Sequence, residues 1–241
     1  ALNVIPHPGE LVFDEGQYTC QSTITMPDGP EGPIAVKSIS LTGNGTTLYY
    51  TGPNESVETP FFDFRGSAGT AQYGGKIKNL SFAGASHDSN IIGLWFYKVS
   101  GAYLANLSCR RFTNGIRIDY WYFYTAFNKI SCIDCGYGLK ALSIGNGAIF
   151  NACRFSDNSL VGLSLNNSNS FDSGVIIDAC YLEGNGTAIE VKLGGTLTII
   201  NSYFENNNRY ILDILDVSSV MGITREFIVS MHNCFIYPNC T

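Results

Sequence analysis

Two glutamates occupy matching places in a short segment that recurs in the chain. The segment reads Cys180-Tyr-Leu-Glu183 in one copy and Ser202-Tyr-Phe-Glu205 in the next copy. A pair of carboxylates can cleave a glycosidic bond when the two groups stand about 5–5.5 Å apart (retaining) or about 6.5–9.5 Å apart (inverting). One carboxyl group protonates the leaving oxygen, and the other attacks the sugar or activates water. Glu183 and Glu205 are therefore candidate catalytic residues if the fold stacks the two copies.

Aromatic and basic side chains accompany this pair. Tyr181 and Tyr203 fill matching positions, and Arg154 stands at the same position one copy earlier. Aromatic rings can stack on sugar faces, and an arginine can hold a carboxylate. The predicted acids and bases are Glu183, Glu205, Asp178 and Asp157, and the predicted substrate-binding residues of this region are Arg154, Tyr181, Tyr203 and His232.

The same side chains are compatible with other functions. In a lyase, a tyrosine or histidine would remove the proton next to a substrate carboxylate that Arg154 neutralises. In a protein without catalytic activity, the stacked tyrosines would stabilise a sheet or pack against another subunit. The sequence leaves these alternatives open.

The elements that must position these residues form a repeat. Seven copies of a six-residue pattern have an apolar first residue, a small or apolar fourth residue and a bulky sixth residue. They begin at Ile77, Leu104, Phe127, Phe150, Ile177, Ile199 and Met231. The steps between copies suit three short strands with their turns, so each copy predicts one coil of a solenoid. The third position is expected to bend in the left-handed conformation that asparagine tolerates; its asparagines are Asn79, Asn106, Asn201 and Asn233.

A second apolar strand follows most copies, for example Gly115-Ile-Arg-Ile118 and Gly138-Leu-Lys-Ala141. Its outward column should contain Glu190 and Asp213, a second stacked acidic pair that we include among the substrate-binding candidates. Alternating apolar residues at this step would bury a continuous core. The sequence thus predicts an all-β, right-handed, single-stranded parallel β-helix. We expect one domain over residues 1–241, with capping coils in 1–75 and regular coils in 76–241.

Composition excludes several classes of function. The net charge of −6 argues against nucleic-acid binding, which needs clustered Lys and Arg. The apolar stretches are far shorter than the ~20 residues of a membrane span. Of the eight cysteines, only Cys132 and Cys135 have Cys-x-x-Cys spacing, and the repeat directs most of the others inward as buried thiols. We therefore expect no metal and no cofactor.

One local cluster is rich in aromatic residues. The run Asp119-Tyr-Trp-Tyr-Phe-Tyr124 contains five consecutive aromatic side chains, and alternate members must point outward if the segment is extended. Exposed aromatic patches mark contact surfaces. Trp121 is therefore a candidate for sugar binding or for a subunit interface.

The opening segments, Pro8-Gly-Glu-Leu-Val-Phe-Asp-Glu-Gly-Gln-Tyr18 and Ile39-Ser-Leu-Thr-Gly-Asn-Gly-Thr-Thr-Leu-Tyr49, resemble the start of pectate-lyase-like β-helices. The phrases Cys180-Tyr-Leu-Glu-Gly-Asn185 and Ser202-Tyr-Phe-Glu-Asn206 are similar to those of bacteriophage tailspikes and tail-fibre depolymerases. The resemblance implies a homotrimer, on the virion or secreted, that binds and cleaves bacterial capsular polysaccharide or lipopolysaccharide.

The chain also departs from related enzymes. It lacks the paired Asp with Gly-His-Gly of plant-type polygalacturonases and the Arg-rich motif of calcium-dependent lyases. A glycoside hydrolase that uses outward carboxylates is therefore the favoured expectation. A polysaccharide lyase and a non-catalytic glycan-binding or structural segment are the alternatives.

Overall fold

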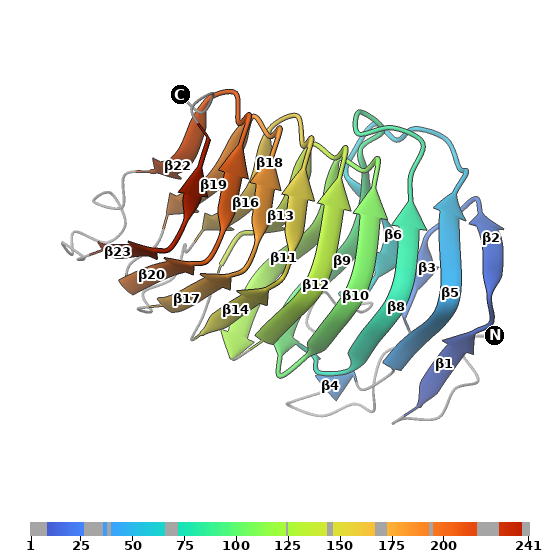
Figure 1. Cartoon of the computed structure of the whole chain (residues 1–241). Helices are drawn as coiled ribbons and strands as arrows, with labels where there is room; N and C mark the ends of the chain where they lie inside the picture. The colour runs from blue at the N-terminus through green and yellow to red at the C-terminus, as the bar shows by residue number, and fades with distance from the viewer. Residues whose placement is uncertain are drawn as a thin grey trace.

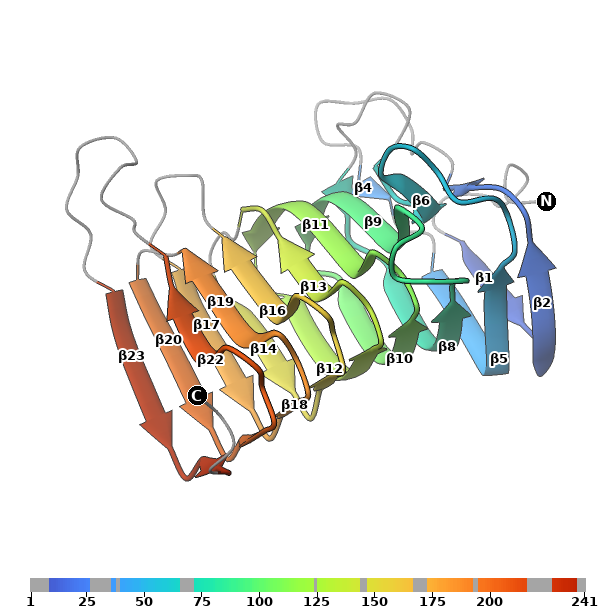
Figure 2. The ribbon, with the colours of Figure 1, turned by 90° about the horizontal axis from the view of Figure 1, so that it is seen from above.

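The computed structural model describes residues 9–26, 36–37, 40–65, 72–123, 125–143, 147–166, 173–192, 195–215 and 227–237. Strands succeed one another along a single axis, as Figure 1 shows, and Figure 2 shows the coils following one another from the N-terminal to the C-terminal end. All of the strand pairs are parallel, with register steps of about one coil, for example β10 with β12 and β11 with β13. The predicted right-handed parallel β-helix is confirmed.

Two sheets form the walls of the solenoid. The 14-stranded sheet, here sheet A, has the main path β1 (Glu10–Phe13), β5 (Ser40–Tyr50), β8 (Lys76–Ala83), β10 (Tyr103–Arg110), β12 (Thr125–Ile133), β14 (Ala148–Asn151), β17 (Ser173–Asp178), β20 (Gly195–Ile200) and β23 (Phe227–His232). Its remaining strands are β2 (Gly16–Cys20), β15 (Arg154–Ser156), β18 (Tyr181–Glu183), β21 (Tyr203–Glu205) and β24 (Phe235–Ile236).

The 10-stranded sheet, here sheet B, contains β3 (Ile24–Thr25), β4 (Val36–Lys37), β6 (Thr59–Asp63), β7 (Gln72–Tyr73), β9 (Ile91–Ser100), β11 (Asn114–Phe123), β13 (Tyr137–Ala141), β16 (Val161–Asn166), β19 (Thr187–Lys192) and β22 (Tyr210–Ile214). The described part of the chain has no helix long and apolar enough to cross a membrane.

A left-handed residue bends sheet A in every repeat. The third position has φ between 50° and 58° in all seven copies, at Asn79, Asn106, Lys129, Ala152, Ala179, Asn201 and Asn233. The prediction made for the four asparagines is confirmed, and the same conformation occurs where the residue is lysine or alanine. The bend divides the outer surface of sheet A into a pre-bend face and a post-bend face.

Stacked apolar side chains fill the interior. Phe127 and Phe150 stack with ring centroids 4.8 Å apart, and Cys109 lies in register with Cys132, both fully buried. The seven described cysteines are free thiols, as the repeat predicted. Burial raises the pKa of the Cys135 thiol to about 12, so this side chain remains neutral at physiological pH and packs as a small apolar group.

An asparagine ladder closes the corner between sheet A and sheet B. Asn158, Asn185 and Asn207 are each fully buried and lie on successive coils. The Asn185 side-chain oxygen accepts hydrogen bonds from the backbone and side-chain nitrogens of Asn158 at 3.2 and 2.8 Å. Its amide nitrogen donates to Asn207 Oδ1 at 3.0 Å and to the Phe155 carbonyl at 2.9 Å. The ladder thus satisfies the buried backbone nitrogen of Asn158, which lies in a turn, and adds a hydrogen bond to the Phe155 carbonyl of β15.

A glycine is required where sheet B begins on successive coils. A Cβ on Gly138 would lie 2.4 Å from the Gly162 carbonyl oxygen and 2.9 Å from a Phe155 ring carbon. We predict that Gly138→Ala lowers the free energy of unfolding by about 1–3 kcal/mol, because the backbone must move to relieve the contact. The measurement is urea unfolding. Gly174→Ala is the matched control, since the nearest atom to its added Cβ is 3.7 Å away; equal losses in both variants would contradict this explanation.

Candidate functional site

Glu183 and Glu205 stack on adjacent coils. They are direct partners in the pairing of β18 with β21, as are Tyr181 and Tyr203. Neighbouring strands lie about 4.7–4.9 Å apart, so the predicted stacking of these two positions on adjacent coils is confirmed. On the preceding coil Arg154 pairs with Tyr181, and buried Ser156 takes the place that corresponds to Glu183.

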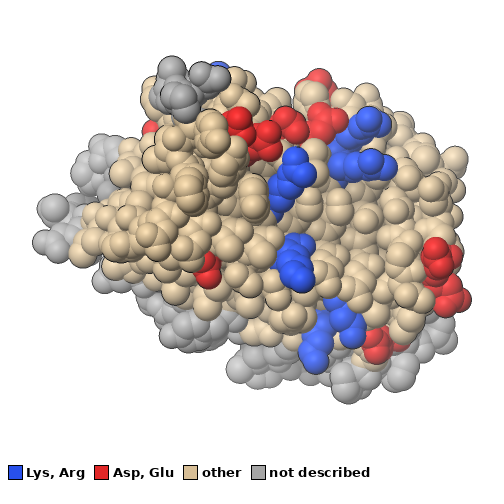
Figure 3. Space-filling model, viewed as in Figure 1, with Lys and Arg blue, Asp and Glu red and all other residues tan. Residues whose placement is uncertain are grey.

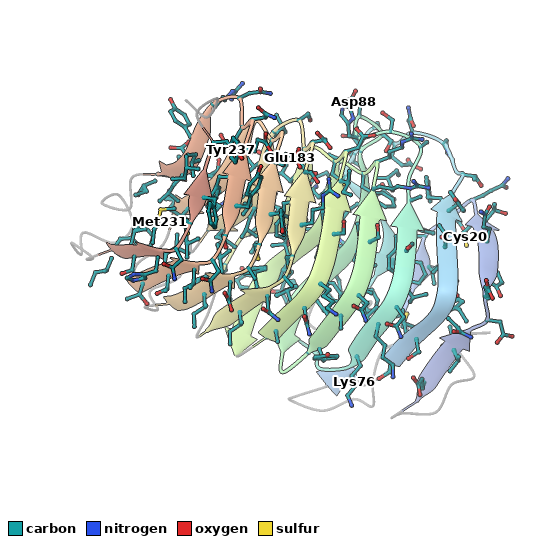
Figure 4. The ribbon with its side chains drawn as sticks, viewed as in Figure 1. Cys20, Lys76, Asp88, Glu183, Met231 and Tyr237 are labelled. Atoms are coloured by element: carbon teal, nitrogen blue, oxygen red, sulfur yellow. The ribbon has the colours of Figure 1, made fainter. Side chains whose placement is uncertain are left out.

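An aromatic column runs beside the two glutamates. The rings of Tyr181 and Tyr203 are 5.6 Å apart, and the rings of Tyr203 and Tyr237 are also 5.6 Å apart. Tyr181 is 54% exposed and Phe235, the partner of Tyr203 on the next coil, is 66% exposed. Figure 4 shows Glu183 and Tyr237 along the same edge of the molecule. We call Arg154, Tyr181, Glu183, Tyr203 and Glu205 the post-bend site.

The two carboxylates have different partners. The Arg154 guanidinium lies 3.7 Å from Glu183 Oε2 and also donates through Nε to Ser156 Oγ at 2.8 Å. The Tyr203 hydroxyl donates to Glu205 Oε2 at 2.5 Å. Glu183 therefore faces an exposed cation, whereas Glu205 accepts a hydrogen bond from a neutral phenol. This asymmetry permits the two carboxyl groups to take different chemical roles.

The hydrogen bond to Glu205 changes the acidity of Tyr203. It is the largest cause that raises the pKa of Tyr203 from 10.0 to about 12, followed by burial and by the charge of Glu205. The phenol therefore remains protonated at neutral pH, and Tyr203 is a hydrogen-bond donor in the post-bend site.

A titration can test this coupling. Because the folded-state pKa of Tyr203 is raised, its contribution to stability is complete below pH 10 and is lost as the pH rises through about 12. We predict that the Tyr203 resonance, assigned by its loss in Tyr203→Phe, titrates near pH 12 in 13C-tyrosine NMR spectra. In Glu205→Gln the midpoint should return toward 10. An unchanged midpoint in that variant would contradict the coupling.

Other predicted residues lie away from the glutamate pair. Asp178 and His232 are on the pre-bend face, where Asp178 accepts a hydrogen bond from Asn201 Nδ2 at 3.1 Å and His232 pairs with Ile200. Asp157 occupies the corner after the post-bend strand, with φ of 55°, and its backbone nitrogen donates to the Glu183 carbonyl. Only Asp157 of these three therefore borders the post-bend site.

The second predicted acidic pair is on sheet B. Glu190 and Asp213 are partners in the pairing of β19 with β22, as expected. Glu190 also accepts a 2.8 Å hydrogen bond from Ser164. This pair belongs to a different wall of the solenoid from Glu183 and Glu205. Trp121 is in β11, but its side chain lies outside the described residues.

Acidic and basic side chains occupy different regions of the surface. In Figure 3 acidic side chains gather along the upper edge, and basic side chains lie on the face below them. Arg110, Arg154 and Lys129 are among the exposed residues of this sheet A surface. The post-bend site itself combines both signs of charge, since Arg154 lies 3.7 Å from Glu183.

The chain is similar in fold to a phage protein. ORF18 of Geobacillus virus E2 superposes with a TM-score of 0.62 at 17% sequence identity, over 95% of this chain and 52% of that protein. The chain thus spans about half the length of that structure, and at this identity the likeness shows the fold alone.

Two further solved structures align over most of the chain with lower scores. They are the pectate lyase Bsp165PelA from Bacillus sp. N165 in complex with trigalacturonate (TM-score 0.40, 13% identity, 98% of this chain and 86% of that one) and the catalytic domain of a GH87 α-1,3-glucanase in complex with nigerose (TM-score 0.28, 13% identity, 96% and 63%). No protein family and no curated protein sequence matches the chain.

A polar cluster on sheet B was not anticipated from the sequence. The Trp95 ring lies between two guanidinium groups, with Arg65 3.8 Å and Arg117 4.2 Å from its centroid. Asp119 accepts from both Trp95 Nε1 and Arg117 Nε, and Arg117 also binds Glu58. Arg117 is therefore engaged by Asp119 and Glu58 within the protein. Arg65, Trp95 and Arg117 are far apart in the sequence, and no motif with a fixed spacing connects them.

Across the described ranges of the chain, no group of three or more His, Cys, Asp or Glu side chains is arranged to hold a metal ion.

Proposed function

We propose that the protein binds a bacterial surface polysaccharide and hydrolyses its glycosidic bonds at Glu183 and Glu205. The observation that carries this proposal is the register of these two carboxylates on adjacent coils, directly beside an exposed aromatic column. Two glutamates whose backbones are one strand spacing apart can bring their carboxyl groups into the range that glycosidases use once side-chain tilt is included.

The partners of each carboxylate suggest its role. Glu205 accepts the Tyr203 phenol hydrogen bond, which orients it as a nucleophile or as a base that activates water. Glu183 is then the second carboxyl group of the pair. Arg154 donates through Nε to Ser156, but its side chain is 53% exposed, so the outer nitrogens of its guanidinium can reach an acidic group of the substrate.

The direction of the aromatic column suggests how the substrate lies. Tyr181, Tyr203 and Phe235 follow one another along the solenoid axis, one on each coil. Sugar rings that stack on these side chains would place the polymer along the axis. This arrangement suits an endo-acting enzyme, because an open sheet surface does not require a chain end.

Location and assembly form part of the same proposal. The fold similarity to a phage protein supports a place on a phage virion, with secretion as the alternative. A homotrimer would cover apolar side chains on the pre-bend face, where Tyr103, Ile149 and Ile176 are exposed.

Two alternatives are favoured by specific observations. Both carboxylates already have partners within the protein, which is compatible with a site that holds glycan without cleaving it. For a lyase, Lys140 and Glu190 on sheet B, which pair with Ser164 from the coils on either side of it, would supply a cation and a carboxylate. The raised pKa of Tyr203 makes this tyrosine unsuitable as the base of a lyase in the post-bend site.

The test is an assay with a panel of purified capsular polysaccharides and lipopolysaccharides. New reducing ends without ultraviolet absorbance from an unsaturated product would support hydrolysis. Reducing ends together with that absorbance would indicate a lyase. Binding to a polysaccharide with neither signal would overturn the enzymatic proposal and support a binding module.

A further inference from the structure

A pocket of about 240 Å³ lies at the corner between sheet A and sheet B. It is lined by His87, Asp88, Asn90, Thr113, Gly136, Ser159 and Leu160, which come from four successive coils. Glu183 and Glu205 are not among these residues. In Figure 4 Asp88 stands on the upper edge of the molecule, as Glu183 does farther toward the C-terminal end.

Differences in turn length create this pocket. The corner turn between β8 and β9 has seven residues, 84–90, whereas the next two turns, 111–113 and 134–136, have three each. The following turn, 157–160, again has an extra residue. Two short turns therefore lie between a long turn and one of intermediate length. Thr113 and Gly136, which belong to the short turns, form the floor of the pocket. A Cβ on Gly136 would lie 2.6 Å from the Thr113 carbonyl oxygen, so the two short turns pack directly against each other.

Hydrogen bonds hold the long turn in place. The Ser89 hydroxyl donates to the Ser86 carbonyl at 2.7 Å, and Asn90 Nδ2 donates to the Glu55 carbonyl at 2.8 Å. The Thr113 hydroxyl donates to the His87 carbonyl at 2.9 Å, which ties the turn to the pocket floor. The pocket is therefore already formed before a ligand binds, which reduces the entropic cost of binding.

One wall of the pocket is polar and the other is apolar. His87 lies between two carboxylates, with Nε2 3.4 Å from Asp88 and Nδ1 3.6 Å from Asp134. The Asp88 side chain is 84% exposed, so its oxygens can accept further hydrogen bonds. On the opposite wall, Leu160 is 45% exposed and presents an apolar surface beside the Ser159 hydroxyl.

We propose that this corner pocket binds one neutral sugar residue. Hydroxyl groups of a pyranose would donate to Asp88 and bond with Ser159 and the His87 ring, while its C–H face would rest on Leu160. The volume is below the roughly 300–1,000 Å³ that drug-sized ligands occupy, and it therefore suits a single ring. The carboxylates of Asp88 and Asp134 disfavour an anionic ligand. The proposal does not depend on cleavage at the post-bend site.

The test is protein NMR with methyl glycosides of glucose, galactose, mannose, rhamnose and N-acetylglucosamine. At least one glycoside should cause saturable shifts in the His87 ring signals and in the amide signals of Ser159 and Leu160. Leu160→Trp should abolish these shifts by filling the pocket. Asp88→Asn should weaken binding by at least about tenfold, because a hydrogen bond to a charged group is lost.

Controls separate this proposal from the catalytic one. Glu15→Gln, which changes an exposed carboxylate elsewhere, and Glu183→Gln should each retain glycoside binding, and thermal unfolding should show that every variant is folded. The proposal is overturned if no glycoside shifts these signals or if the shifts persist in Leu160→Trp. It is also overturned if glucuronate, phosphate or a divalent cation, and not a neutral glycoside, produces them.

Discussion

Replacing Glu183 or Glu205 with glutamine is expected to lower polysaccharide cleavage by about 10²–10⁴-fold in each variant, the usual contribution of a general acid or base. Glutamine keeps the size and polarity of the side chain but can neither protonate a leaving group nor attack a sugar. Both residues are partly exposed strand ends, so folding should be unaffected. The measurement is the rate of reducing-end release from the polysaccharide that the wild-type protein cleaves.

Variants at other carboxylates show whether cleavage depends on Glu183 and Glu205 in particular. Glu15→Gln, at an exposed position remote from the proposed site, should cleave at the wild-type rate. Full activity in both Glu183→Gln and Glu205→Gln would remove this pair from the mechanism. If activity were lost in Glu190→Gln or Asp213→Asn instead, the catalytic pair would be the one on sheet B, where the same stacking occurs.

Replacing Asn185 with leucine is expected to lower the free energy of unfolding by about 3–5 kcal/mol, because a buried group left unpaired costs about 1–3 kcal/mol. Leucine has a similar volume but cannot make the ladder's hydrogen bonds. The substitution leaves the Asn158 backbone nitrogen without its acceptor, removes one donor to the Phe155 carbonyl and removes a partner of Asn207. Urea unfolding monitored by circular dichroism measures the change.

An exposed asparagine provides the control for this effect. Asn151 donates one 3.3 Å hydrogen bond to Asn128 on the pre-bend face. Asn151→Ala should change stability by no more than about 0.5 kcal/mol, as is usual for surface sites. If Asn185→Leu were as mild as Asn151→Ala, the ladder would not be a principal source of stability.

The coil register could be predicted from the sequence because the pattern of buried apolar residues recurs once in every coil. Each inward position has an apolar residue one coil later, so aligning Leu182 with Phe204 also aligns Glu183 with Glu205. The bend was predicted at Asn79 and Asn106 from residue type. At Lys129 and Ala152 the same conformation follows only from the position in the repeat, since these residues have no special preference for it.

The repeat could not predict the hydrogen-bond and ion-pair partners of the outward side chains. The contacts of an outward side chain depend on its rotamer and on the conformation of neighbouring turns. The pattern of inward apolar residues constrains neither of them. The contact of Arg154 with Glu183 and the hydrogen bond from Tyr203 to Glu205 are examples. The arrangement of Arg65, Trp95 and Arg117 likewise depends on where a loop and two strands meet. Asp178 and His232 were grouped with the glutamates because the sequence alone does not show how sharply the bend separates the two faces.

The unequal corner turns have an evolutionary consequence. Residues can be inserted or deleted in one of these turns without displacing the strands on either side, since each strand is held by its counterparts on the coils above and below. The outline of the surface can therefore diversify while the interior keeps its alignment. A scaffold of this kind could acquire a new ligand preference through a change of a few residues in a single loop.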